Sequence, residues 1–240
     1  MGKRKMKKQR GIILGITMVL AFTIIGCAKE NTARSADSTV SATESKTESK
    51  TESKTESTSF SIGKWNGHVF ENEWLNMKFF IPDTWKIATD EEISALIGLG
   101  AEQVKIDGTS KEQLEKAIKL KNVYSFIVSE PSGVVNAQLM YENLALSIGG
   151  TSYDEKMYID TTVNVLLKQK DYQYKVLEQG SEVIANKTFQ TVKLSLYNGA
   201  MEQMYYCYKQ NNFMVNMIVS YQPAQSELKN DFVKNISLIK

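Results

Sequence analysis

The aromatic residues of this chain are concentrated in its last three quarters, and this limits where a fold can form. No aromatic residue occurs between Phe22 and Phe60. All three Trp, all eleven Tyr and all three Pro lie in residues 60–240. Because burial of apolar and aromatic surface drives folding, a packed core is predicted only for that stretch. At about 180 residues it has the size of one domain.

The charges are distributed as unevenly as the aromatic residues. The whole chain has 29 basic and 27 acidic residues, for a net charge of +2. Six of the basic residues lie in residues 1–10, without a single acid among them. Residues 60–240 alone carry 18 basic and 21 acidic residues. A mildly acidic domain does not fit a nucleic-acid partner.

The first 26 residues have the layout of an export signal. The basic stretch 1–10 is followed by the apolar run 11–25. That run is about 15 residues long, shorter than the roughly 20 that a membrane-spanning helix needs. A basic region, a short apolar region and a small residue before a cleavage site are typical of a signal peptide. An uncleaved signal anchor is the alternative.

Four residues at the end of this segment, Ile24-Ile25-Gly26-Cys27, resemble the lipobox of bacterial lipoprotein signal peptides. The resemblance implies that the chain is cut before Cys27 and that diacylglycerol is attached to the Cys27 sulfur. Two acyl chains suffice for stable membrane anchoring. The expected location is therefore the extracytoplasmic face of the bacterial cell membrane, with the lipid on Cys27 as the membrane contact.

Residues 27–59 differ from the segments on either side. TESK occurs at 43–46, 47–50 and 51–54, and the only large aliphatic residue in 28–59 is Val40. Such a segment cannot bury enough apolar surface to offset its conformational entropy, so we expect a disordered tether. The predicted organisation is a signal peptide over 1–26, a lipidated Cys and tether over 27–59, and one domain over 60–240.

Local patterns in the first half of the domain predict short strands and two helices. Asp90 is a favourable N-cap for the first helix, which Gly98 and Gly100 are expected to end. Ser110 and Gln113 form a capping box for the second. The predicted strands are 65–71, 75–81, 122–129 and 135–142, and the predicted helices are 91–99 and 111–121.

The second half of the domain has clearer periodicity. Asn198-Gly199 favours a two-residue hairpin turn. The predicted strands are 172–178, 188–197, 201–209 and 213–221. The predicted helices are 154–169, with an apolar stripe at Ile159, Val163, Leu166 and Leu167, and 224–237, with a stripe at Leu228, Phe232, Val233 and Ile236. Successive strands with helices between and after them predict an α+β fold in which helices pack on an antiparallel sheet.

The order of elements is similar to that of the Mog1/PsbP-like fold. The segment Met77–Trp85 resembles the early strand, proline and tryptophan of that group, and the strand-turn-strand Gly180–Tyr197 and the aromatic strand Met204–Tyr208 add to the likeness. The resemblance could cover residues 65–240. It implies a binding or assembly factor rather than a catalyst.

The sequence contains no catalytic constellation, no cofactor motif and no metal-binding motif. His68 is the only histidine, and we interpret it as a surface or strand residue. Cys207 lies in a predicted strand and is interpreted as a small packed residue with no disulfide partner. Asp90-Glu91-Glu92 fits a helix N-terminus better than a metal site. Gly149-Gly150 is interpreted as a turn.

Tyrosines are the one enrichment that remains. Tyr197, Tyr205, Tyr206, Tyr208 and Tyr221 fall on neighbouring predicted strands. Alternation places Tyr206 and Tyr208 on one face of the sheet and Tyr205 with Cys207 on the other. These tyrosines form either cross-strand pairs in the core or a binding face for a partner. Trp65, Trp74 and Trp85 are expected in the core or at its rim.

The leading hypothesis is a membrane-anchored extracytoplasmic lipoprotein whose domain binds an envelope protein or a small ligand, without catalysis and without a cofactor. Two alternatives stay open. The first is a hydrolase acting on the cell wall, or an inhibitor of one, in which paired carboxylates would carry the chemistry. The second is solute capture for a transporter, which a domain without an evident two-lobe pattern does not favour.

Overall fold

A computed structural model of the chain describes residues 59–103, 111–147 and 149–239. The signal peptide, the lipobox Ile24–Cys27 and the tether up to residue 58 lie outside these ranges, as does the predicted cap Ser110. In the part of the chain that is described, no helix has both the length and the apolarity needed to cross a bilayer.

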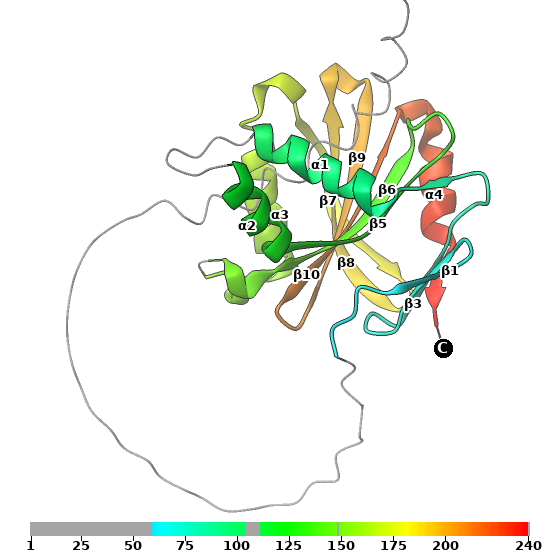
Figure 1. Cartoon of the computed structure of the whole chain (residues 1–240). Helices are drawn as coiled ribbons and strands as arrows, with labels where there is room; N and C mark the ends of the chain where they lie inside the picture. The colour runs from blue at the N-terminus through cyan, green and yellow to red at the C-terminus, as the bar shows by residue number, and fades with distance from the viewer. Residues whose placement is uncertain (1–58, 104–110, 148, 240) are drawn as a thin grey trace, which may run out of the picture.

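The centre of the domain is a seven-stranded antiparallel sheet (Figure 1). Its strand order is β4-β5-β6-β10-β9-β8-β7. The last four strands form a meander that folds back, so that β10 pairs with β6. The strands are β4 Lys86–Ile87, β5 Asn122–Ser129, β6 Asn136–Asn143, β7 Lys175–Ile184, β8 Lys187–Leu196, β9 Met201–Gln210 and β10 Phe213–Tyr221.

A smaller sheet brings together the two ends of the domain. Its order is β1-β2-β3-β11, and every pair in it is antiparallel. The strands are β1 Lys64–Asn66, β2 Val69–Asn72, β3 Met77–Phe80 and β11 Ile236–Leu238. The last strand of the chain therefore pairs with the third.

Helices and the small sheet cover the two faces of the large sheet. The helices are α1 Asp90–Gln103, α2 Lys111–Lys121, α3 Glu155–Leu166 and α4 Ser226–Lys234. Short 3-10 turns lie at Leu144–Leu146, Gly150–Ser152, Lys170–Tyr172, Tyr197–Gly199 and Pro223–Gln225. The small sheet and α4 pack on one face, and α3 packs on the other.

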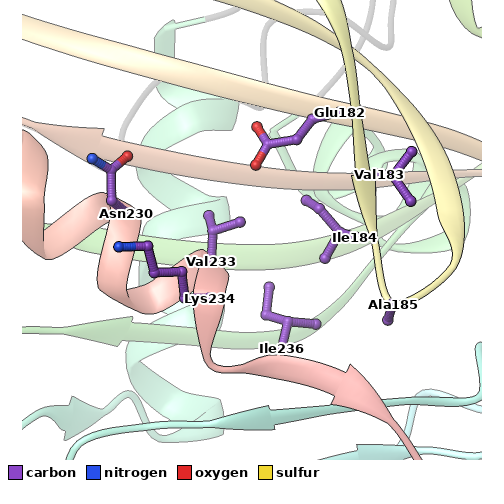
Figure 2. Close-up of a pocket in the computed structure, with 8 residues that line it drawn as sticks. All are labelled: Glu182, Val183, Ile184, Ala185, Asn230, Val233, Lys234 and Ile236. Atoms are coloured by element: carbon purple, nitrogen blue, oxygen red, sulfur yellow. The ribbon is translucent and has the colours of Figure 1, made fainter.

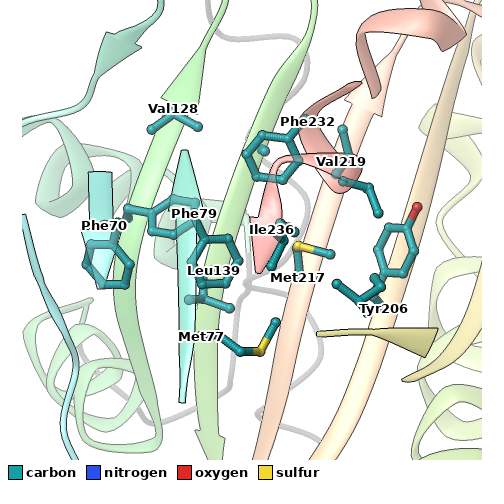
Figure 3. Packing of buried hydrophobic residues seen from close by; sticks show 14 of the residues in the cluster. Phe70, Met77, Phe79, Val128, Leu139, Tyr206, Met217, Val219, Phe232 and Ile236 are labelled. Atoms are coloured by element: carbon teal, nitrogen blue, oxygen red, sulfur yellow. The ribbon is translucent and has the colours of Figure 1, made fainter. Parts of the chain in front are cut away.

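Each face has its own apolar core, because the strands present side chains alternately to the two sides. The α4-side core, shown in Figure 3, includes Phe70, Phe79, Leu139, Tyr206, Met217, Phe232 and Ile236. The α3-side core includes Tyr158, Ile159, Val163, Val192, Tyr205, Cys207 and Ile218. The large sheet is thus buried on both faces over its middle strands.

The predicted α+β fold with an antiparallel sheet is confirmed, and β5 and β10 have the predicted bounds. The predicted strand 65–71 is wrong as one strand, because Gly67, at φ +58°, turns the chain between β1 and β2. The predicted end of the first helix is also wrong, because α1 continues through Gly98 and Gly100 to Gln103. Its cap lies one residue earlier than predicted, where the Thr89 hydroxyl accepts the Glu92 amide and the Glu92 carboxylate accepts the Thr89 amide.

Two hairpins differ from the predictions. The loop between β8 and β9 has four residues rather than two, with Tyr197, Asn198 and Gly199 all at positive φ. The two-residue turn with positive φ at both positions is Ala185-Asn186 instead, at +46° and +59°. This turn lets β7 run to Ile184, beyond the predicted end at residue 178.

The two predicted helical stripes are partly wrong. Ile159, Val163 and Leu166 are buried, but Leu167 follows the last turn of α3 and is 47% exposed. In α4, Phe232 and Val233 are buried, and Leu228 is 39% exposed. The predicted helix 224–237 ends at Lys234, and Ile236 is buried as part of β11.

Candidate binding surface at β7 and α4

Strand β7 forms one edge of the large sheet and lies open to solvent. It pairs with β8 on one side and ends the strand order on the other. Its first nine residues are all exposed. They include three large apolar side chains, Val176, Leu177 and Val183, of which Val183 is 68% exposed. A long edge strand with exposed apolar side chains and no proline can pair with another chain.

The register of β7 is fixed at both of its ends. The turn Ala185-Asn186 pairs Ile184 with Lys187. A bulge between Val176 and Glu178 shifts the register near the other end, beyond which Lys175 and Val176 still pair with β8. Since Ile184 belongs to the α4-side core, alternation places Gly180 and Glu182 on that same face. Gln179, Ser181 and Val183 then lie on the opposite face.

A groove lies between the end of β7 and α4. We call it the α4 groove; its volume is about 310 Å³, and it is lined by Glu182, Val183, Ile184, Ala185, Asn230, Val233, Lys234 and Ile236. Figure 2 shows Glu182 on the β7 side and Asn230 and Lys234 on the α4 side. The buried side chains of Ile184, Val233 and Ile236 supply its apolar part.

Charged side chains surround the outer part of this groove. Glu178 and Glu182 are exposed on β7. Lys193 of β8 pairs with Glu202 of β9 at 2.8 Å. On α4, burial lowers the pKa of Lys229, and nearby carboxylates, Glu182 foremost, act in the opposite direction. The edge of the sheet therefore presents carboxylates beside a depression lined by apolar side chains together with Asn230 and Lys234.

A second groove lies on the other side of α4. It also has a volume of about 310 Å³ and is lined by Pro82, Trp85, Leu228, Asp231, Phe232, Lys234 and Asn235. Trp85 stacks on Phe232 with ring centroids 5.9 Å apart and an interplanar angle of 7°. Each groove has a single carboxylate in its lining, Glu182 in the first and Asp231 in the second.

The five tyrosines considered as a binding face do not lie on one surface. Tyr206 and Tyr221 are buried in the α4-side core, and Tyr205 is buried in the α3-side core. Tyr208 and Tyr197 are half-buried against those two cores, respectively. The predicted alternation of Tyr206 with Tyr205 and Cys207 is confirmed. The five tyrosines therefore do not form one open binding face.

A buried polar network crosses the α3-side core. The Tyr158 hydroxyl donates to Glu142 Oε2 at 2.7 Å, and the Lys121 ammonium lies 3.2 Å from Glu142 Oε1. Asn216 Nδ2 donates to the Tyr158 hydroxyl at 3.0 Å, and Cys207 Sγ donates to Asn216 Oδ1 at 3.1 Å. Burial raises the pKa of the Cys207 thiol, so Cys207 is a packed residue of low reactivity.

The other residues considered for chemistry have structural positions. His68 lies half-buried in the β1–β2 turn. Glu92 pairs with Lys86 and caps α1. Gly149, at φ +68°, precedes a 3-10 turn, and α3 begins later, capped by Asp154. Within the described ranges, no group of three or more His, Cys, Asp or Glu side chains is placed to hold a metal ion.

The tryptophans lie where the sequence placed them. Trp74 and Trp85 are buried in the α4-side core, and Trp65 packs half-buried against it. Phe60 stacks on Phe213 at 4.3 Å and contacts the ring of Trp74 at 5.0 Å. Phe60 therefore packs against the same aromatic residues that form this end of the α4-side core.

Comparison with known proteins assigns no family to the chain. No family model matches it, and no curated protein matches it. The solution structure of cyanobacterial PsbP (CyanoP) from Synechocystis sp. PCC 6803 is similar with a TM-score of 0.43 and 8% identity, covering 72% of this chain and 94% of that one. LpqN, described as involved in cell envelope biogenesis of Mycobacterium tuberculosis, has a TM-score of 0.34 and 9% identity, covering 68% and 82%. A PsbP protein is thus among the structures that are similar to this chain.

Proposed function

We propose that this chain is a membrane-anchored extracytoplasmic lipoprotein whose domain binds a partner and catalyses no reaction. The single observation that carries the binding role is the exposed β7 edge beside the α4 groove. A long sheet edge without a neighbouring strand that exposes apolar side chains is typical of an interaction site. The anchoring rests on the resemblance of Ile24–Cys27 to a lipobox.

The two alternatives receive less support from the geometry. A cell-wall hydrolase needs two carboxylates that converge on the bond to be cleaved. Each groove beside α4 has one carboxylate in its lining. At about 310 Å³, each groove is at the small end of the range for sites that hold a small molecule, which disfavours solute capture.

Acyl labelling tests the anchor. Cells that express the full chain are grown with a labelled fatty acid, and the wild type is compared with Cys27→Ala. The wild type is expected to take up label and to fractionate with the membrane, and the variant is expected to do neither. Equal incorporation in both proteins would refute lipidation of Cys27.

Site-specific crosslinking in the same cells tests the binding role. A photoreactive amino acid is placed at Val183 on β7, at Leu228 beside the second groove and, as a control, at Met157 on α3. Met157 is also exposed, at 47%, but it lies on α3, which covers the opposite face of the large sheet from α4. Protein adducts from Val183 or Leu228, and not from Met157, are expected. No adduct at any position, with a small molecule co-purifying instead, would overturn the proposal.

A further inference from the structure

The backbone of β7 has a free row of hydrogen-bonding groups. In an antiparallel hairpin closed by a two-residue turn, the residues flanking the turn form a hydrogen-bonded pair, here Ile184 and Lys187. Alternation then directs the N–H and C=O groups of Gln179, Ser181 and Val183 away from β8. No strand pairs with that side of β7 in the described sheet. The free row can hydrogen-bond to an added strand.

The side chains next to this row define an acidic gap. Glu178 and Glu182 flank Gly180, and all three are exposed. Four residues of extended strand place the two Cα atoms about 13 Å apart. Gly180 leaves the space between the carboxylates open, with only the Thr191 hydroxyl of β8 near the position of its missing side chain, at 3.7 Å. Neither carboxylate forms an ion pair with a residue that the structure describes.

The charges that face this gap come from the neighbouring elements. Lys193 on β8 is already paired with Glu202. Lys229 on α4 lies behind β7, where Glu182 is its strongest attractive neighbour. Lys234 also lines the α4 groove, so three lysines match the three glutamates of this region in number. Glu178 and Glu182 are the carboxylates that lie exposed on the outer strand. A long basic side chain on an added strand would complement them.

We propose that the β7 edge binds an extended polypeptide segment of another protein, by strand addition, with a lysine or arginine seated opposite Gly180 between Glu178 and Glu182. An apolar side chain of the same segment, a few residues along, lies in the α4 groove over Ile184, Val233 and Ile236. The proposal rests on the proposed function, since it names the partner chemistry of that same surface. Backbone pairing supplies affinity, and the acidic gap supplies selectivity.

Peptide binding to the full lipoprotein in detergent micelles tests the mode. The probes are two fluorescent peptides, one of alternating valine and lysine and one of alternating valine and glutamate, and the readout is fluorescence anisotropy. The lysine peptide is expected to bind at least about tenfold more tightly, because like charges placed opposite each other on paired strands repel. Equal binding of the two peptides would overturn the proposal.

Two matched variants separate strand addition from charge attraction. Ser181→Pro removes an N–H that points away from β8. It is therefore expected to lower the affinity for the lysine peptide at least about tenfold while leaving the hairpin folded. Ser181→Ala keeps the N–H and is expected to bind as the wild type does. The double variant Glu178→Lys with Glu182→Lys is expected to prefer the glutamate peptide. Unchanged binding by Ser181→Pro, or an unchanged preference in the double variant, would refute the mode.

The crosslinking positions distinguish this proposal from the broader one. Val183 adducts that map to an extended basic and apolar segment of another protein would support strand addition. Protein adducts at Leu228 alone would overturn strand addition and leave the binding role intact. Adducts of Val183 to a second copy of this chain would overturn the proposal in favour of self-association through β7. The absence of adducts at both positions would overturn both proposals.

Discussion

The ion pair between Lys121 and Glu142 provides a demanding test of the buried network. Both side chains are nearly inaccessible, at 12% and 7% exposure, and the Glu142 carboxylate also accepts the Tyr158 hydroxyl. Replacing Glu142 by Leu removes the carboxylate from beside the buried Lys121 ammonium and leaves the Tyr158 hydroxyl without its acceptor. Removal of one partner from a buried pair costs about 3–5 kcal/mol, a large part of the stability of a domain.

Replacing both partners should cost much less. In the double variant Lys121→Met with Glu142→Leu, no charge is left buried, and apolar pairs of similar volume are often as stable as the ion pair that they replace. The remaining cost comes from the Tyr158 hydroxyl, about 1 kcal/mol. The two substitutions are therefore predicted to be strongly non-additive.

Urea unfolding of the full chain in detergent, followed by tryptophan fluorescence, measures these changes. With a slope of about 2 kcal/mol per molar urea, Glu142→Leu alone should lower the midpoint by about 2 M, and the double variant by about 0.5 M. Phe232→Ala, which removes the partner of Trp85 in the other core, is a control that should not couple to either change. A double variant as unstable as the sum of the two single variants would refute the reasoning.

Three further predictions concern single positions. In the turn Ala185-Asn186, Asn186→Gly should raise the free energy of unfolding by about 0.5 kcal/mol, because glycine is preferred at the exposed second position. Asn186→Val should lower it, and the opposite order of stability in urea unfolding would contradict the turn geometry. Gln138→Met should leave the free energy of unfolding in urea unchanged or higher, since neither polar atom of the buried Gln138 side chain has a hydrogen-bond partner among the described residues; a loss above about 1 kcal/mol would contradict this. Cys207 should react with iodoacetamide only after urea unfolding, and mass spectrometry of labelled native protein showing rapid alkylation would contradict its burial.

Local periodicity predicted most of the large sheet. In β10, apolar residues continue over both faces because the strand is buried on both, and its predicted bounds match the structure. In β8, Val192 and Leu194 alternate with Lys193 and Ser195, which fixes the faces without knowledge of the partners. These segments lie in the middle of the sheet, where local pattern and tertiary packing agree.

The errors arose where tertiary pairing decides the outcome. Ile236 fits a helical stripe with Phe232 and Val233, yet it belongs to β11 because β3 offers an unpaired edge far away in the sequence. The helix α1 keeps Gly98 and Gly100 in its interior, where glycine lowers helix propensity without necessarily ending the helix. The local sequence around Ile236 does not indicate the pairing of β11 with β3.

The candidate surface was harder to predict than the fold. The sequence drew attention to tyrosines, but aromatic residues on a central strand such as β9 are buried by the layers on both faces. The exposed residue Val183 reads like any other strand residue, because a sequence does not show which strand will lie at the edge. The sequence does predict the strand-turn-strand Gly180–Tyr197 that contains Val183. Its turn was not predicted, because Ala185 is an unusual residue for a position with positive φ.

The pairing of β11 with β3 has a consequence for the order of events during biogenesis. The ribosome and any export channel release the chain from its N-terminus, so Met77, Phe79 and the rest of the small sheet emerge long before their partners Ile236 and Leu238. Until β11 is released, β3 lacks its partner strand on that side and the α4-side core lacks the side chain of Ile236. The small sheet, which joins segments from both ends of the domain, can therefore be completed only after β11 has been synthesised.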